Sequence, residues 1–410
     1  MNPNGATDAI KSIDAINLES IGRDAENERR QTIAAAYRLL ARLETPFEQM
    51  WKYTATLNTM AALQTLIDLG LWQGWKEDHV DSEPEKSLDD LLKCCRHPCD
   101  KELLRRLLRI MSAACLIEQV GPDRHRPTLT SLALGDEKDV VAHTAMVTGA
   151  QYTASAMNLP KFLAETQYQQ PLDPKNTNFM DANADRLPLF AFLQTDPSAQ
   201  AHFVCAMKGL SQRKRPWTEL YDTKVLVDGH DATRPLLVDI GGGHGLDVTR
   251  MLERHCCTGD DGDPLLGDLV LQDLPDVVAL AKEKVVSDRI KVMAHDFFQP
   301  QPLKGARAYL LRSVLHDWND EKAHDILRMT AAAMERGYSK LLVCDTVLPA
   351  TGASLDLASA DIMMMHLHSA RERPEDEWRR LLERAGLTVV KMWCDVSTTS
   401  TDTVIEAELV

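Results

Sequence analysis

The sequence contains no apolar run long enough to cross a bilayer, and its first residues are polar, without the apolar core of a secretion signal. It also has no excess of positive charge: 61 acidic residues stand against 46 basic ones, for a formal net charge of -15. Such a chain is poorly suited to bind nucleic acids or anionic membranes. We therefore expect a cytoplasmic protein that has neither of these as its main partner.

The cysteines do not form the pattern of a disulfide framework, because there are nine of them, an odd number, scattered through 410 residues. The tightest group, Cys94, Cys95, His97 and Cys99, could bind zinc in principle. No second pair of ligands follows at a usual spacing, so a structural or surface role is the simpler interpretation. We expect no metal site.

Two common phosphate-binding signatures are missing from the glycine-rich stretch at 236–245. Position 246 is a leucine, so the dinucleotide fingerprint G-x-G-x-x-G does not fit, and no Gly-Lys-Ser/Thr follows to make a P-loop. What is present is an apolar strand, the acid Asp239, then Gly241, Gly243 and Gly245, and then helical spacing. This order favours a cradle for a nucleotide-like ligand, although a tight turn alone would give the same pattern. Asp239 would repel a phosphate but attract an amine or a sulfonium.

The overall composition, 44% hydrophobic and 26% charged, is that of a soluble globular protein, and the length allows two or three domains. From position 236 onward, strand-like and helical segments alternate, which predicts a parallel sheet covered on both faces and closed by a terminal strand pair. The predicted strands are 236–240, 269–272, 290–294, 308–311, 340–344, 387–393 and 403–409.

The first third of the chain has helical periodicity over 27–44 and 46–69, and these amphipathic helices would either form a dimer surface or pack on their own chain. Ser87 and Asp100 are expected to cap two further helices, and 116–130 to form a hairpin. Helix, helix, hairpin is the order of a winged helix. Its second helix carries Arg105, Arg106 and Arg109, which could touch phosphate, but a solvated polar face fits the acidic chain better.

Residues 140–225 are predicted to be helical and connective, and they include His143, Phe203 and Met207. Phe203 and Met207 are four positions apart and share one helix face. That face would either pack in the core or form the wall of a pocket for a flat apolar substrate. We thus divide the chain into a helical extension (1–45), a winged-helix-like domain (46–140), a connecting region (141–225) and a sheet domain (226–410).

Acidic and aromatic residues follow successive predicted strands, where ligands bind on parallel sheets. Asp273 follows the second strand and could accept hydrogen bonds from ribose hydroxyls. Asp296 and Phe297 follow the third, where the acid could take an adenine amino group and the ring could face the base. His316 comes after the fourth, in the sequence His-Asp-Trp.

The form D-x-G-x-G-x-G resembles the first motif of class I S-adenosylmethionine-dependent methyltransferases. With the later Asp-Leu-Pro and His-Asp-Trp, the chain from about residue 46 onward resembles the O-methyltransferases of secondary metabolism, the caffeate and flavonoid type and its fungal relatives. The resemblance implies an α/β fold with a Rossmann-like class I methyltransferase sheet, a winged-helix dimerisation domain and a homodimer. It also implies S-adenosylmethionine as cofactor and a small phenolic or enolic, polyketide-like substrate.

The same resemblance implies roles for particular residues. His316 would be the general base, assisted by Asp345 and Glu372; relatives often carry glutamate at the first of these, so the reach of Asp345 is in question. Cofactor contacts would come from Asp239, Gly241, Gly243, Gly245, Asp273, Asp296, Phe297 and Arg312. Substrate contacts would come from Phe203, Met207, Met364 and His368.

Elementary chemistry supports such a base independently. A phenol has a pKa near 10 and a free imidazole one near 6.5, so full proton transfer is uphill by roughly 5 kcal/mol. Flanking carboxylates raise the pKa of the imidazole and fix its tautomer. Asp345 and Glu372 are what a histidine directed at a phenol would require.

A different class of function stays open. Some fungal relatives resemble pericyclases or dehydratases built on the same fold, which bind the cofactor without transferring a methyl group, and His143 could then act on the substrate. Such proteins tend to have lost the histidine that is present here as His316, which favours methyl transfer. A winged-helix regulator that senses a cofactor is disfavoured by the acidic charge.

Overall fold

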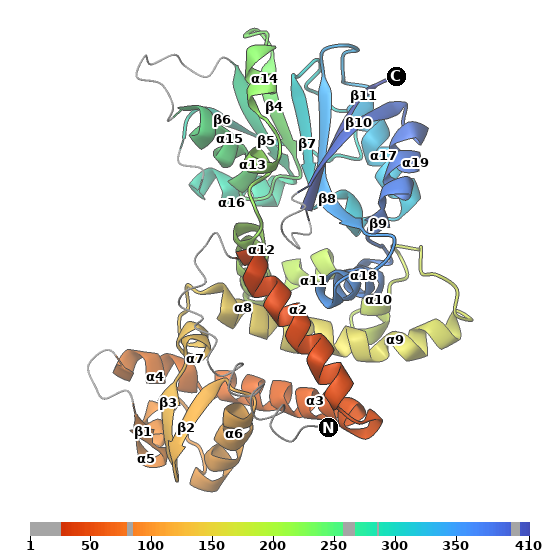
Figure 1. Cartoon of the computed structure of the whole chain (residues 1–410). Coiled ribbons are helices and arrows are strands. Elements are labelled where there is room, and N and C mark those ends of the chain that lie inside the picture. Colours follow the sequence, from red (N-terminus) through yellow and green to blue (C-terminus); the bar gives the residue numbers. More distant parts are fainter. Residues whose placement is uncertain (1–25, 80–84, 257–266, 285–286, 395–401) are drawn as a thin grey trace. The chain divides into compact units, whose positions relative to one another are not determined.

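The computed structural model describes residues 26–79, 85–256, 267–284, 287–394 and 402–410 (Figure 1). These residues fall into two compact units, 26–56 and 57–394 with 402–410. Residues 1–25 of the predicted helical extension, and residues 257–266 ahead of the second predicted strand, lie outside the described residues. No helix among those described is long and apolar enough to cross a membrane.

The first unit consists of two helices, as predicted: α2 (Glu26–Leu43) and the first part of α3 (Pro46–Asp68). Thr45 and Glu48 cap α3 reciprocally, each side chain accepting from the other residue's backbone N–H. Large apolar side chains on both helices are exposed, and Leu43, Phe47 and Trp51 are between 60 and 71% exposed. The unit therefore presents an apolar surface that it does not cover itself.

The second unit starts with the predicted winged helix. It comprises the rest of α3, α4 (Leu71–His79), β1 (Lys86–Ser87), α5 (Leu88–Cys94), α6 (Lys101–Ala113), β2 (Ile117–Gly121), β3 (Arg124–Pro127) and α7 (Leu129–Leu134). The three strands pair in the order β1-β3-β2. Ser87 and Asp100 cap α5 and α6 as predicted. The predicted hairpin is too long, because Thr128 caps α7 and ends the second strand.

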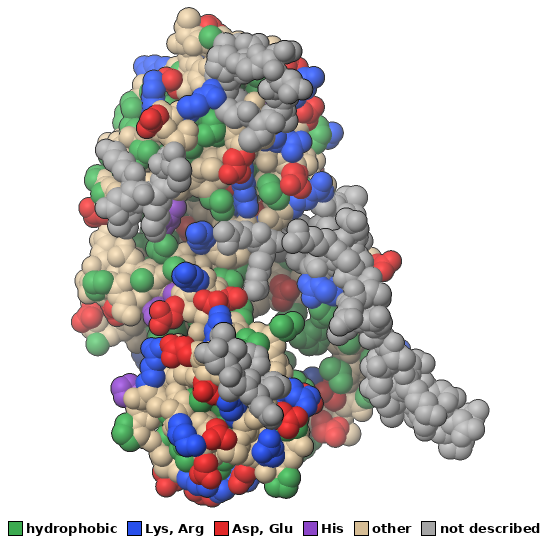
Figure 2. All heavy atoms as spheres, turned by 90° about the vertical axis from the view of Figure 1, so that its left-hand side faces the viewer, with side chains coloured by type: hydrophobic (Ala, Val, Ile, Leu, Met, Phe, Trp, Pro, Cys, Tyr) green, Lys and Arg blue, Asp and Glu red, His purple; other side chains and the backbone are tan. Residues whose placement is uncertain are grey.

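Charges on this module are largely paired. Arg105 of α6 donates to Asp123 at 2.8 Å and to Glu102. Its guanidinium is therefore paired within the protein. On the face drawn in Figure 2, basic and acidic side chains are intermingled. Both observations fit the interpretation of this face as a solvated one.

Helices connect the winged helix to the sheet, as predicted for 140–225. They are α8 (Val140–Val147), the π-helical turn η3 (Thr148–Tyr152), α9 (Thr153–Glu165), α10 (Asn178–Ala182), α11 (Leu189–Thr195), α12 (Pro197–Arg213), α13 (Trp217–Leu220) and α14 (Lys224–Asp228). α12 packs on α8, and α9 and α10 pack on α18 (Leu355–His368).

All seven predicted strands are confirmed: β4 (Pro235–Ile240), β5 (Asp268–Asp273), β6 (Ile290–Ala294), β7 (Ala308–Arg312), β8 (Lys340–Leu348), β10 (Leu387–Cys394) and β11 (Asp402–Leu409). They form one sheet in the order β10-β11-β8-β7-β4-β5-β6. The first five in sequence are parallel, and β11 pairs antiparallel with both β8 and β10.

Both faces of this sheet are buried. On β7, Tyr309 and Leu311 belong to one apolar cluster while Ala308 and Leu310 belong to another, as the alternation of side chains along a strand requires. Helices lie on the two sides (Figure 1): α15 (Leu246–Cys256) and α16 (Pro275–Lys284) on one, α17 (Asp320–Ala331) and α19 (Glu375–Arg384) on the other. The predicted Rossmann-like α/β fold with an N-terminal helical part is confirmed.

Candidate active site

The glycine stretch forms a tight turn between β4 and α15. Gly241, Gly243 and Gly245 have φ values of +69°, +57° and +78°, a region that residues with a Cβ rarely adopt. A Cβ at Gly241 would lie 3.0 Å from Val314, whereas a Cβ at Gly243 would meet nothing within 4 Å. The backbone at Gly243 therefore borders open space, as a ligand cradle requires.

Asp273, at the end of β5, holds this turn in place. Its carboxylate accepts from the backbone N–H of Gly243 at 2.8 Å and of Leu274 at 2.7 Å. Burial raises its pKa, and the two backbone donors oppose that effect. Each carboxylate oxygen has a second lone pair, so the group can still accept from a ligand hydroxyl.

Asp239 and Phe297 both lie close to the turn. Asp239 is buried, and its Oδ2 has no hydrogen-bond partner among the described residues. Burial raises its pKa well above the usual range, and the neighbouring Asp247 carboxylate adds to this. The ring of Phe297 passes 3.6 Å from the position a Cβ would take on Gly241, and Asp296 beside it accepts from the N–H of Phe298.

Arg312, at the end of β7, is buried and forms ion pairs with two acids. It donates to Asp247 at 2.9 Å and to Asp402 at 3.1 Å, and Lys214 donates to Asp402 at 2.6 Å. These ion pairs tie β7, the start of β11, α15 and the end of α12 together. Cofactor contact by Arg312 stays a prediction.

His316 lies in the short 3-10 helix η4 (Leu315–Asp317) that follows β7. Its Nδ1 is 3.0 Å from Oε1 of Glu372, a hydrogen bond, and 3.6 Å from Oδ1 of Asp345. The structure thus brings the three predicted catalytic residues together, with Asp345 in ion-pair range but without a hydrogen bond. Nε2 is left facing away from these acids, 3.6 Å from Oδ1 of Asp317.

The electrostatics of this group are unusual. Burial alone would lower the pKa of His316, but Asp345, Asp317 and Glu372 together raise it to about 10. Burial raises the pKa of Asp345 to about 7, against the opposing charge of His316. Both oxygens of Asp345 and Oε2 of Glu372 have no hydrogen-bond partner among the described residues, so His316 is their main neutralising group.

Arg373 fixes the η4 backbone, a role not predicted from the sequence. It is fully buried and donates to the carbonyls of Leu315 at 2.9 Å and Trp318 at 2.7 Å, on both sides of His316. The Glu-Arg pair that holds Glu372 therefore also holds the loop that carries the histidine. The sequence did point to Arg373, because it directly follows the predicted catalytic residue Glu372.

Aromatic side chains adjoin the histidine. His368 of α18 has its Nε2 3.9 Å from Oδ1 of Asp317 and is stacked on Phe190, with ring centroids 5.2 Å apart. Phe190 in turn meets Phe203 edge to face at 6.2 Å. Two predicted substrate residues, Phe203 and His368, are thus joined through Phe190, which was not predicted to bind substrate.

The remaining predicted substrate residues are less directly connected. Met364 is buried on α18, and Met207 is half-buried on α12. His143 makes its polar contacts within the helices: its Nδ1 is 2.9 Å from Nδ1 of His202, and its Nε2 is 2.9 Å from the carbonyl of Glu137. Their contacts with a substrate stay predictions.

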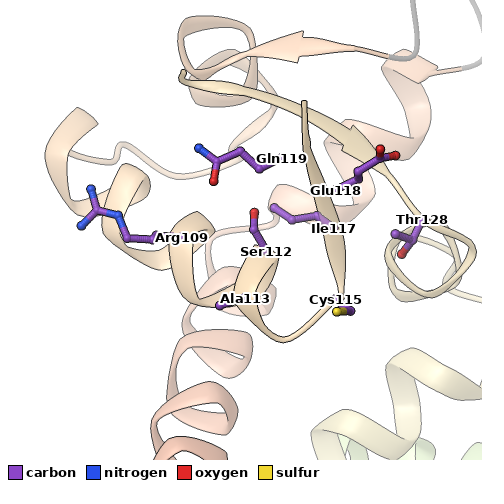
Figure 3. A pocket seen from close by; sticks show the side chains of 8 residues that line it. All are labelled: Arg109, Ser112, Ala113, Cys115, Ile117, Glu118, Gln119 and Thr128. Atoms are coloured by element: carbon purple, nitrogen blue, oxygen red, sulfur yellow. The ribbon is translucent and has the colours of Figure 1, made fainter. Parts of the chain in front are cut away.

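A hollow elsewhere in the second unit carries none of these residues. It lies on the winged-helix module between α6, β2 and the start of α7, and Figure 3 shows its lining: Arg109, Ser112, Ala113, Cys115, Ile117, Glu118, Gln119 and Thr128. It holds no histidine and has no part in the site at the sheet.

Comparison with known proteins identifies the family. The model of the O-methyltransferase domain matches residues 173–388. The O-methyltransferase ATR12 of Stachybotrys chlorohalonatus (strain IBT 40285) is 41% identical over 401 residues, which cover 98% of each chain. The chain belongs to the O-methyltransferase family. The predicted membership is thereby confirmed.

Solved structures resemble this O-methyltransferase family member over nearly its whole length. The structure of LepI in complex with S-adenosylmethionine is 26% identical and has a TM-score of 0.86, with 99% of each chain covered. A structure described as a pericyclic reaction enzyme gives the same identity, TM-score and coverage. The similar structures therefore include a protein that binds S-adenosylmethionine and one that carries out a pericyclic reaction.

Proposed function

We propose that the protein transfers a methyl group from S-adenosylmethionine to a phenolic or enolic hydroxyl of a small, polyketide-like metabolite, with His316 as the general base. The observation that carries this proposal is the arrangement around His316. Two buried carboxylates lie at Nδ1, which is hydrogen-bonded to Glu372, and Nε2 faces away from both, 3.6 Å from Asp317. A histidine so held can take a proton through Nε2 only.

The residues at the ends of β4, β5 and β6 fit S-adenosylmethionine. The turn at Gly243 leaves space for the methionine end, Asp273 has free lone pairs for ribose hydroxyls, and Phe297 borders the turn where adenine would lie. The unpaired oxygen of Asp239 can accept from a positively charged group, whose charge would oppose the raised pKa of this carboxyl. When bound, the cofactor supplies an electrophilic methyl group on a sulfonium.

His316 is matched to a phenol. The proton transfer that costs roughly 5 kcal/mol for a free imidazole becomes nearly balanced when the imidazole's pKa is about 10, the pKa of a phenol. A base of this strength is itself protonated near neutral pH, so the transfer takes place in the complex in which His316 and the phenol share one proton. The aromatic wall of Phe190, Phe203 and His368 suits a flat ring.

A pericyclic reaction is the second candidate, because one similar structure over 99% of both chains belongs to an enzyme of that class. In this case the bound cofactor would contribute charge, and His143 could act on the substrate. The two buried acids behind His316 favour methyl transfer, since a pericyclic step needs no base of such strength.

Products from a panel of phenols, incubated with trideuteromethyl-labelled S-adenosylmethionine and analysed by intact mass, separate the two candidates. Gain of one labelled methyl group supports methyl transfer. An isomerised or dehydrated product without the label would sink it in favour of the second candidate.

We further propose that the protein is a cytoplasmic homodimer formed through its first 130 or so residues. The exposed apolar side chains of α2 and α3, among them Leu43, Phe47 and Trp51, are the support for this. Light scattering at micromolar concentration should give twice the chain mass, and Trp51→Glu should lower it. A wild-type monomer would contradict the proposal.

A further inference from the structure

One turn of the helix that runs from α8 into α9 is widened. Residues Thr148–Tyr152 form the π-helical turn η3, in which the backbone N–H of Thr153 donates to the carbonyl of Thr148. The hydroxyl of Thr153 donates to the same carbonyl at 2.7 Å. Such turns inside α-helices are rare and often occur at functional sites. The extra residue rotates the following side chains by about 100° relative to those before it.

The side chain at the end of this turn is Tyr152, which packs against the buried cluster of Phe179, Leu189, Leu193 and Leu367. Leu367 precedes His368 on α18, and α18 contacts η4, which carries His316 and Asp317. Burial raises the pKa of the Tyr152 phenol, and the charge of Asp317 adds to this effect. Phe203, a predicted substrate residue, packs against the same cluster, so the widened turn places a tyrosine near the aromatic side chains of the proposed site.

The hydroxyl of Tyr152 differs from those of the tyrosines that serve the fold. Tyr309 donates to the carbonyls of Leu303 and Ala333, and Tyr221 donates to Glu406. No hydrogen bond joins the Tyr152 hydroxyl to another of the described residues. Tyr152 is only partly buried, and its hydroxyl is not one of the fully buried unpaired atoms among the described residues, so it is accessible to a ligand that can bond to it.

We propose that Tyr152 is a substrate-binding residue whose hydroxyl donates a hydrogen bond to a second oxygen of the substrate. The preferred substrates then carry, besides the hydroxyl that reacts, another hydroxyl, carbonyl or ether oxygen on the same ring system. This inference rests on the proposed function, because the first oxygen is placed by His316. The second oxygen fixes the rotation of the ring about the first and so decides which hydroxyl is methylated.

Four small phenols test the inference. Phenol has one oxygen, whereas catechol, resorcinol and hydroquinone add a second at three different positions. With Tyr152→Phe, the KM of at least one diol should rise about tenfold, which is the loss of one hydrogen bond of about 1.4 kcal/mol, with kcat within about twofold. The KM of phenol should not change.

Two variants serve as controls. Tyr168→Phe alters a tyrosine that is 76% exposed and should leave all four KM values unchanged. Thr153→Val removes the hydroxyl that supports the widened turn and should raise the same diol's KM by a smaller factor. Thermal unfolding will show whether Tyr152→Phe folds. If it does not, Thr153→Val provides the test instead.

The outcome is distinguishable from failure of the proposed function. Calorimetric Kd values for the same four compounds do not depend on methyl transfer, so they test Tyr152 even if no methyl group is transferred. A wild-type protein that binds no diol more tightly than phenol overturns the inference. So does a Tyr152→Phe protein whose affinities for all four compounds change by one common factor.

Discussion

Two groups of buried acids lie side by side, around neighbouring residues of β8 and β11. They are neutralised in different ways. Asp402 and Asp247 surround Arg312, with Lys214 also on Asp402. Asp345 and Glu372 surround His316. The two groups are adjacent, because Asp402 pairs with Thr346 and Thr403 with Asp345 in neighbouring strands.

The cations of the two groups differ in whether they can lose a proton near neutral pH. Burial works to raise the pKa of Asp402, but Lys214 and Arg312 hold it below its usual range. Their charges are permanent near neutral pH, so that group is built for stability. Around His316 the acids have unpaired oxygens, and Asp345 has a pKa raised to about 7. A cation that can lose its proton suits chemistry rather than stability.

The largest expected effect comes from removing the titratable cation. His316→Ala should lower kcat by at least about 100-fold, because the base is lost, while the Kd for S-adenosylmethionine stays within about twofold. Activity assays and calorimetry on the same preparation provide the measurement. Lost cofactor binding would refute the assignment of His316 as a base outside the cofactor site.

The two acids beside His316 should contribute to kcat to different extents. Glu372→Gln should lower kcat about tenfold, equivalent to about one pKa unit lost from His316, because its hydrogen bond is 3.0 Å long. Asp345→Asn should lower it only about threefold, since Asp345 is 3.6 Å away and makes no hydrogen bond to His316. Steady-state kinetics at about pH 9.5, where the productive one-proton complex is largely formed, measures both, and a larger loss for Asp345→Asn would reverse this ranking.

Substitutions in the group around Arg312 should change the stability of the fold instead of the catalytic rate. Arg312→Met leaves Asp247 and Asp402 less compensated, which should lower the free energy of unfolding by about 3 kcal/mol in urea titrations. Arg379→Ala, which breaks the exposed pair with Glu375, is the matched control and should cost less than about 1 kcal/mol. Equal stability of the two variants would contradict the comparison. A cofactor Kd that rises more than tenfold would instead support the predicted cofactor role of Arg312.

Much of the fold follows from local patterns in the sequence. Apolar periodicity located all seven strands of the sheet, and Ser87 and Asp100 marked two helix starts, because these signals depend on neighbouring residues only. The joining of His316 with Asp345 and Glu372 followed from the family resemblance.

Other features depend on distances that no local pattern encodes. Whether Asp345 or Glu372 bonds to His316 is decided by the length and direction of a side chain. The occupation of Arg312 by Asp247 and Asp402 joins residues 65 and 90 positions apart. The π-helical turn that ends at Tyr152 has no sequence signal comparable to a cap or a proline.

The pH dependence of kcat/KM for a phenol tests the central claim most directly, namely that buried carboxylates make His316 a base matched to a phenol. Free enzyme and free phenol each carry a proton below about pH 10, and the productive complex holds only one of the two. The account predicts that kcat/KM rises about tenfold per pH unit from pH 6 to about pH 9, and that Glu372→Gln moves this rise to lower pH. A wild-type profile that levels off near pH 7 would contradict it.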